Sequence, residues 1–152
     1  MGYNCMEEVS REITFKAQQR GIHQIFFEDP IWFSTQLLAQ RKEQFCDAES
    51  MDSDLVFFDR GLPDVVAYLD YIDCDYPNKF TDECQNYRYD KVFILEPWEA
   101  IYTQDNERYE SFKQAVKIHN YLIKWYHKFN YELLTVPQES VENRIIYILE
   151  NC

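Results

Sequence analysis

Glycine is scarce in this chain of 152 residues, which contains only Gly2, Gly21 and Gly61. A phosphate-binding Walker A loop needs two glycines five positions apart followed by Lys and Ser or Thr, because its backbone N–H groups cradle the phosphates. No two of the three glycines have that spacing, so this sequence does not contain the loop. Any phosphate site built from these residues alone would lack the backbone cradle.

Three further absences narrow the class of protein. The formal net charge of −12 argues against a surface that neutralises nucleic-acid phosphates, which needs clustered Lys and Arg. No apolar run approaches the ~20 residues of a membrane span, and the first residues lack the charged and apolar regions of a signal peptide. The five cysteines are odd in number and form no CxxC pair, which is typical of reduced thiols. We therefore expect a cytoplasmic protein that binds neither nucleic acid nor a membrane.

The composition is that of a folded domain. Hydrophobic residues make up 46% of the chain and aromatic residues 17%, and no Gly/Ser-rich linker interrupts it. A chain of this length can bury a sizeable core and fits one domain on the usual size range. We expect a single domain over residues 1–152.

The tripeptide Asp59-Arg60-Gly61 is the most informative motif. It follows the apolar run 55–58, which is typical of a buried strand, and precedes a helix-like segment. In open α/β sheets, ligands bind outside the carboxyl ends of the strands. A carboxylate can hold Mg²⁺ there, a guanidinium can grip a phosphate, and a Gly lets the backbone approach closely. The motif indicates phosphate chemistry.

Strand-like and helix-like segments alternate along the chain, which indicates an α/β fold with a parallel sheet and right-handed crossovers. Asp29-Pro30 is a good helix start, because Asp caps well and Pro suits the first turn. We expect strands at 5–9, 55–58, 92–95 and 131–136, and helices at 10–20, 30–46, 63–72, 80–86, 108–129 and 140–149.

Six segments resemble, in chain order, the AAA-domain family of small P-loop ATPases, which is related in fold to nucleotide and nucleoside kinases and to the ribosylnicotinamide kinase domain. They are EEVSREI (7–13), Asp29-Pro30, VFFDRGLPDVVAYL (56–69), VFILEPWEAIY (92–102), DNERYESF (105–112) and YELLTVPQESVENRIIYIL (131–149). The resemblance implies a three-layer P-loop NTPase fold, kinase-like, with a parallel sheet covered by helices on both faces.

One part of that family pattern is absent from this sequence. Members carry a strand, a Walker A loop and its helix just upstream of the counterpart of Gly2, so Met1 falls where that helix should run into the second strand. The resemblance therefore implies an N-terminally incomplete domain that lacks the first strand and the P-loop. That strand would lie between segments 55–58 and 92–95. We expect either that the sheet closes or splits around this gap, or that an N-terminal segment or a partner chain fills it.

The resemblance also assigns roles around the tripeptide. Asp59 would be the Mg²⁺-linked acid, Arg60 a ligand of phosphate or substrate, and Asp64 a second acid supporting the site. Each assignment has a structural alternative: Asp59 and Arg60 could form an ion pair at a strand-end turn, and Asp64 suits the dipole of a helix start.

Two more segments would complete the site. Glu8 would act as general base or bind substrate hydroxyls, and Arg11 would be a phosphate partner. Adjacent strand residues point to opposite faces, so only one of Glu7 and Glu8 should enter the site, and we favour Glu8. Arg108 would belong to a lid and stabilise the transferred phosphoryl group. The alternative for the first segment is a charged helix start.

These inferences predict a domain that in complete form binds Mg²⁺ and ATP and transfers or hydrolyses the γ-phosphate, with a small-molecule acceptor that the sequence does not identify. The chain alone would be catalytically incomplete. One alternative is a non-catalytic interaction module that retains the kinase fold. Another is a metal-dependent hydrolase that uses Glu8, Asp59 and Asp64.

Overall fold

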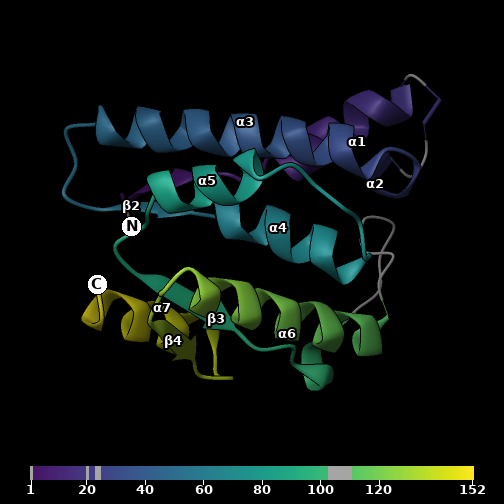
Figure 1. Cartoon of the computed structure of the whole chain (residues 1–152). Helices are drawn as coiled ribbons and strands as arrows, with labels where there is room; N and C mark the ends of the chain where they lie inside the picture. Colours follow the sequence, from purple (N-terminus) through teal and green to yellow (C-terminus); the bar gives the residue numbers. More distant parts are fainter. Residues whose placement is uncertain (1, 20, 23–24, 103–110) are drawn as a thin grey trace. The chain divides into compact units, whose positions relative to one another are not determined.

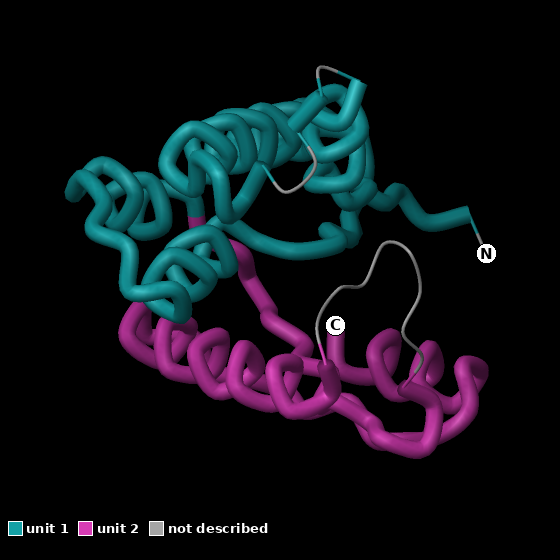
Figure 2. Tube along the Cα trace, turned by 90° about the vertical axis from the view of Figure 1, so that its right-hand side faces the viewer, with its two compact units in different colours: residues 1–87 teal, residues 88–152 magenta. Residues whose placement is uncertain are grey.

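A computed structural model describes residues 2–19, 21–22, 25–102 and 111–152. The chain divides into two compact units, Met1–Tyr87 and Arg88–Cys152 (Figure 2). Each unit combines one pair of strands with helices and is described by itself. The prediction of a single domain stays a prediction.

The first unit is built on two parallel strands (Figure 1). β1 (Asn4–Met6) pairs with β2 (Val56–Phe58), with Cys5 opposite Phe57. A parallel pair needs a long crossover connection, which the first three helices supply. The helices of this unit are α1 (Ser10–Gln19), α2 (Ile25–Glu28), α3 (Pro30–Glu49), α4 (Leu62–Tyr71) and α5 (Lys79–Asn86).

The start of α3 follows from its sequence. The Asp29 carboxylate accepts a hydrogen bond from the Trp32 N–H at 3.0 Å, and Pro30 occupies the first turn. The predicted end near residue 46 is wrong by about one turn, since the helix continues to Glu49. Nothing between these positions breaks a helix, and Ser50 ends it with its N–H bonded back to Asp47 O at 3.1 Å.

Helix α4 forms the core of the first unit. Leu62, Val66 and Leu69 are fully buried in it, and both α3 and α5 pack on it (Figure 1). α5 contributes Phe80 and Cys84, which are also fully buried. Burial, with a smaller effect of nearby Asp64, raises the pKa of the Cys84 thiol to about 12, so this cysteine stays protonated and serves packing.

The second unit is also built on two parallel strands, but it has fewer helices. β3 (Val92–Leu95) pairs in parallel with β4 (Leu133–Val136), and Val92 lies opposite Leu133. A short 3₁₀ turn (Glu99–Ile101), α6 (Phe112–Lys128) and α7 (Val141–Glu150) complete it. Ser111 and Gln114 form a capping box at the start of α6, and the Ser140 side chain caps α7.

The mixed helix–strand composition and the parallel pairing confirm the α/β prediction in its coarse form. Among the described residues the four strands form two separate two-stranded sheets, so β2 and β3 each have one strand neighbour. The three-layer arrangement stays a prediction. No helix in the described part of the chain is long and apolar enough to cross a membrane.

Candidate functional site

The candidate site lies where β1 and β2 end. Because the two strands are parallel, their carboxyl ends meet at one edge, and the Asp59 N–H extends the pairing by donating to Met6 O at 2.9 Å. Glu8 follows β1 by two residues, and Asp59-Arg60-Gly61 follows β2 directly. The fold therefore brings together two segments that lie about fifty positions apart in the sequence.

Glu8 is at the centre of this edge. Its carboxylate pairs with the Arg41 guanidinium (Nη2 to Oε1, 3.3 Å) and with Arg60 (Nε to Oε2, 3.5 Å). It also accepts the Ser10 N–H at 3.1 Å, which turns the chain into α1. The predicted strand 5–9 is wrong at its end for this reason, since β1 stops at Met6. Glu7 is exposed, and its backbone carbonyl accepts from Gln44 at 2.8 Å.

The surroundings of Glu8 favour its charged form. Burial alone would raise the pKa of this carboxyl, but Arg41, the Ser10 N–H and Arg60 outweigh burial and hold the pKa below its usual value of 4.5. Glu8 is therefore a carboxylate at neutral pH. It presents a fixed negative charge and hydrogen-bond acceptors at the end of β1.

Arg60 has an unusual backbone. Its φ is +83°, in the left-handed region that non-glycine residues rarely adopt, and such a conformation costs on the order of 1–3 kcal/mol. Its side chain is 42% exposed. Burial would lower the pKa of the guanidinium, but the nearby Tyr68, Asp64, Glu8 and Asp59 raise it overall, so Arg60 keeps its charge. The turn holds a permanent cation at the edge.

The two aspartates of this region differ in their surroundings. Asp59 is exposed at the strand end. Asp64 is only 5% exposed and accepts the Gly61 N–H at 2.9 Å. Gly61 is the N-cap residue of α4 and Asp64 is its N3 residue, so this hydrogen bond caps the helix. Asp59 can reach a ligand from solvent, whereas Asp64 fixes the backbone of the tripeptide turn. That contact agrees with the helix-start alternative for Asp64.

Sequence reasoning missed Arg41. This side chain comes from α3, is 5% exposed, and donates from Nη1 to Gly61 O at 2.9 Å while Nη2 pairs with Glu8. It thereby ties the end of β1 to the turn after β2. A signal was present: Arg41 lies three and four positions after the buried Leu38 and Leu37, on the apolar face of a helix, where an unpaired charge is very costly.

The remaining predicted site residues are Arg11 and Arg108. Arg11 is exposed in the first turn of α1. Arg108 lies outside the described residues. Their proposed roles stay predictions.

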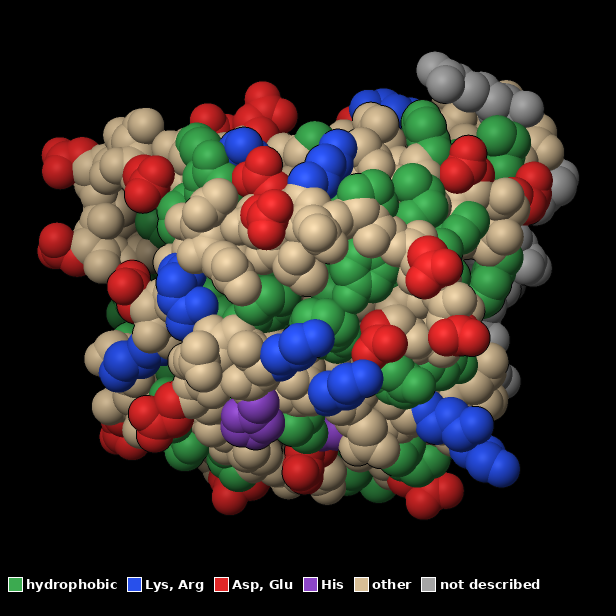
Figure 3. Space-filling model, in the orientation of Figure 1, with side chains coloured by type: hydrophobic (Ala, Val, Ile, Leu, Met, Phe, Trp, Pro, Cys, Tyr) green, Lys and Arg blue, Asp and Glu red, His purple; other side chains and the backbone are tan. Residues whose placement is uncertain are grey.

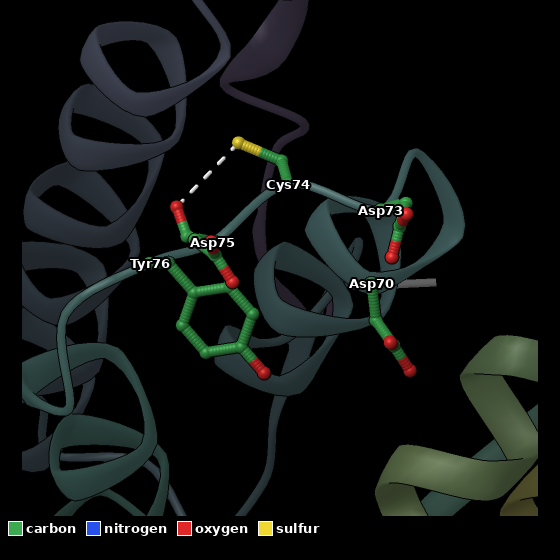
Figure 4. A pocket seen from close by; sticks show the side chains of 5 residues that line it. All are labelled: Asp70, Asp73, Cys74, Asp75 and Tyr76. Atoms are coloured by element: carbon green, nitrogen blue, oxygen red, sulfur yellow. Dashed lines mark hydrogen bonds between the residues drawn. The ribbon is translucent and has the colours of Figure 1, made fainter.

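A hollow lies at the end of α4 and in the loop that follows. Five side chains line it, which Figure 4 shows: Asp70, Asp73, Cys74, Asp75 and Tyr76. Its volume is about 250 Å³. Burial, followed by the charge of Asp70, raises the pKa of Tyr76 to about 12. The part of the chain described by the structure holds no group of three His, Cys, Asp or Glu side chains that could bind a metal ion. Among the described residues, Glu8, Asp59 and Asp64 are therefore not gathered as three ligands of one metal ion.

The lowered pKa of Glu8 predicts a pH-dependent contribution to stability. A group whose pKa is lower in the folded state stabilises the fold above its unfolded pKa and loses that effect as the pH falls through the folded value. The free energy of unfolding of the native chain should exceed that of Glu8→Gln by a constant amount at neutral pH. The difference should shrink as the pH drops below 4.5.

Urea unfolding of both proteins between neutral pH and acid tests this expectation. Glu7→Gln is the matched control, since its exposed side chain lies outside the network. A difference for Glu8→Gln that stays constant into acid would show that the arginines do not hold the Glu8 charge.

The charged residues of the site lie at the carboxyl ends of parallel strands, which is where open α/β sheets bind their ligands. The model of a family described as AAA domain matches residues 1–144, so the chain belongs to that family of P-loop NTPase-type domains. The resemblance seen in the sequence is thereby confirmed. No curated protein and no solved structure matches the chain.

Proposed function

We propose that the protein is the greater part of a kinase-like P-loop NTPase domain with a three-layer fold. Its complete form binds Mg·ATP and transfers the γ-phosphate to a small-molecule acceptor, or to water. One observation carries this proposal: Glu8, Asp59 and Arg60 lie together at the carboxyl ends of two parallel strands. Arg41 joins the two strand ends through its contacts with Glu8 and the Gly61 carbonyl. Family membership supports it.

The residues at the edge fit one side of a Mg²⁺–phosphate site. Mg²⁺ is usually held by one or two carboxylates together with substrate phosphates and water, and the exposed Asp59 supplies one such carboxylate. Bound there, the ion would neutralise phosphate charge. Arg60 keeps a permanent positive charge for a phosphate or substrate anion. Arg11 and Arg108 would add further positive charge.

Glu8 would position the acceptor. As a carboxylate it can accept a hydrogen bond from a substrate hydroxyl and orient it for attack. Its lowered pKa makes it a weak base, so orientation is the larger part of the role that we propose. Positioning and charge stabilisation account for most of the catalysis in phosphoryl transfer.

The phosphate cradle would come from a segment that this sequence does not contain. We propose that a strand from an N-terminal segment or from a partner chain pairs with the edges of β2 and β3, and that a Walker A loop follows that strand. The backbone N–H groups, the Lys and the hydroxyl of such a loop supply most of the grip on phosphate.

Calorimetry with Mg·ATP at millimolar concentration tests the proposal. The chain alone should bind weakly or not at all, because the cradle is absent from its sequence. A version preceded by a strand, a Walker A loop and its helix should bind at micromolar concentrations. Tight binding by the chain alone would mean that groups outside the proposed site hold the phosphates. No binding by the extended version would refute the nucleotide site.

One observation favours the second candidate, a non-catalytic interaction module. Among the described residues, β2 and β3 each lack a second strand neighbour, and open edges pair readily with another chain. The extended version distinguishes the two functions, since an interaction module would show no turnover of ATP.

A further inference from the structure

Helix α6 carries an unusual concentration of positive charge. Four of the eight lysines of the chain lie on it, and none of its 17 residues is Asp or Glu, although the chain has a net charge of −12. Figure 3 shows Lys and Arg side chains gathered over the region where α6 runs in Figure 1. The charge of this helix is therefore opposite to that of the whole protein.

The four lysines form a single stripe, which we call the lysine face: Lys113, Lys117, Lys124 and Lys128. Their spacing of four, seven and four positions places them within about 60° of the helix circumference and along about 22 Å of its length. All four are exposed. The buried residues of α6, among them Ile118 and Leu122, lie on the opposite side of the helix.

The two lysines at the start of the face, Lys113 and Lys117, do not stabilise their own helix. Lysines four positions apart, such as Lys113 and Lys117, repel each other and slightly destabilise a helix. Lys113 also lies in the first turn, where a positive charge opposes the helix dipole. An anionic partner would relieve both effects.

Two of the four lysines, Lys124 and Lys128, are held in place before any partner binds. The Lys128 ammonium lies 4.0 Å from the centroid of the Trp125 ring, and the Lys124 ammonium lies 6.0 Å from it on the same indole. Cation–π contacts of this kind restrict long side chains. Binding an anion then costs less side-chain entropy than it would for free lysines.

We propose that the lysine face docks an acidic segment of a partner polypeptide, with carboxylates spaced to match the four lysines. The net charge of −12 favours a short acidic segment over larger polyanions. Duplex nucleic acid carries one charge per ~1.7 Å, and an anionic bilayer is charged over its whole surface, so both repel the rest of the molecule. A short acidic segment carries only a few negative charges, and all of them can lie within ~8 Å of the lysines, which is the screening distance at physiological salt. Such a segment is therefore repelled less by the rest of the molecule.

The test uses fluorescence anisotropy of a labelled peptide in which four Glu residues repeat the spacing of the four lysines in an Ala/Gln background. A second peptide has Gln in place of each Glu. The full chain should bind the Glu peptide more tightly than the Gln peptide, than single-stranded oligothymidine and than vesicles of phosphatidylserine and phosphatidylcholine. Binding should weaken as salt rises from about 0.05 M to about 0.3 M.

Matched variants locate the contact. Lys113→Gln/Lys117→Gln leaves the Trp125 contacts intact and should weaken binding of the Glu peptide about fivefold. Lys16→Gln/Lys79→Gln removes the same charge from exposed positions of α1 and α5 and should leave binding unchanged. Cooperative thermal unfolding of both double variants shows that both remain folded.

Three results would overturn the proposal. The first is absence of binding to the Glu peptide at low salt, which would mean that the face is simply solvated. The second is equal weakening by the two double variants, which would show a general charge effect. The third is tighter binding to the oligonucleotide or to the vesicles, which would assign the face to another class of partner.

Discussion

Replacing Arg41 with Met is expected to lower the free energy of unfolding by roughly 3 kcal/mol, which is typical of removing one partner from a buried ion pair. Met keeps the packing volume of the side chain while it removes both contacts of the guanidinium. Gly61 O would lose its donor at 2.9 Å, and the largely buried Glu8 would keep one arginine in place of two. The pKa of Glu8 should rise, because burial would remain while the Arg41 charge is lost.

Chemical denaturation measures the stability change, and carbon NMR of the Glu8 carboxyl measures the pKa. Lys42→Met is the control on the same helix, since Lys42 pairs with Glu83 at a partly exposed position and should cost about 1 kcal/mol or less. Equal effects of the two substitutions, with the Glu8 pKa unchanged, would show that Arg41 does not tie the two strand ends together.

The second substitution is Asp59→Asn, made in a version of the chain that is preceded by a Walker A segment. We expect it to lower turnover of ATP by a factor of about 10²–10³, which is the usual loss when a preorganised electrostatic contact is removed. The substitution keeps the shape of the side chain and removes the charge that we propose compensates Mg²⁺. Asp59 is exposed, so stability should change by no more than about 0.5 kcal/mol.

A steady-state phosphate-release assay measures the turnover. Asp54→Asn is the matched control, because Asp54 is an exposed aspartate that precedes β2, whereas Asp59 follows it. Turnover unaffected by Asp59→Asn would defeat the proposed role. A similar loss in both variants would indicate a general effect of charge.

Local rules explain what could be predicted from the sequence. The apolar run before Asp59 predicted β2, and Asp29-Pro30 predicted the start of α3, because strand burial and helix capping are properties of neighbouring residues. The boundaries of β1 and α3 were wrong by a few residues, because hydrophobic periodicity does not show the short-range hydrogen bonds of Glu8 and Ser50 at which these elements end. The short α2 was not predicted.

The candidate site was predictable only where its residues are adjacent to strand ends. The position of Glu8 and of the tripeptide follows from parallel pairing, which brings carboxyl ends to one edge. Arg41 was missed because its role depends on tertiary contacts that span 20 and 33 positions. The left-handed backbone of Arg60 could not be predicted either, since residues of its type rarely adopt it.

Amide hydrogen exchange tests most directly the central claim, that this chain belongs to a nucleotide-binding sheet completed by a further strand. Among the described residues, β2 and β3 each pair with one neighbour, so their other edge leaves backbone groups without a strand partner. Adjacent N–H groups of a strand point to opposite sides, and the Asp59 N–H donates to Met6 O, so the Phe57 N–H points toward β1 and the Phe58 N–H toward the other edge. We predict that the Phe58 amide in β2, and the one of the Phe93 and Ile94 amides that points away from β4, exchange faster in this chain than in a version that carries the Walker A strand. Equal and strong protection of these amides in a monomer of the chain alone would contradict the account.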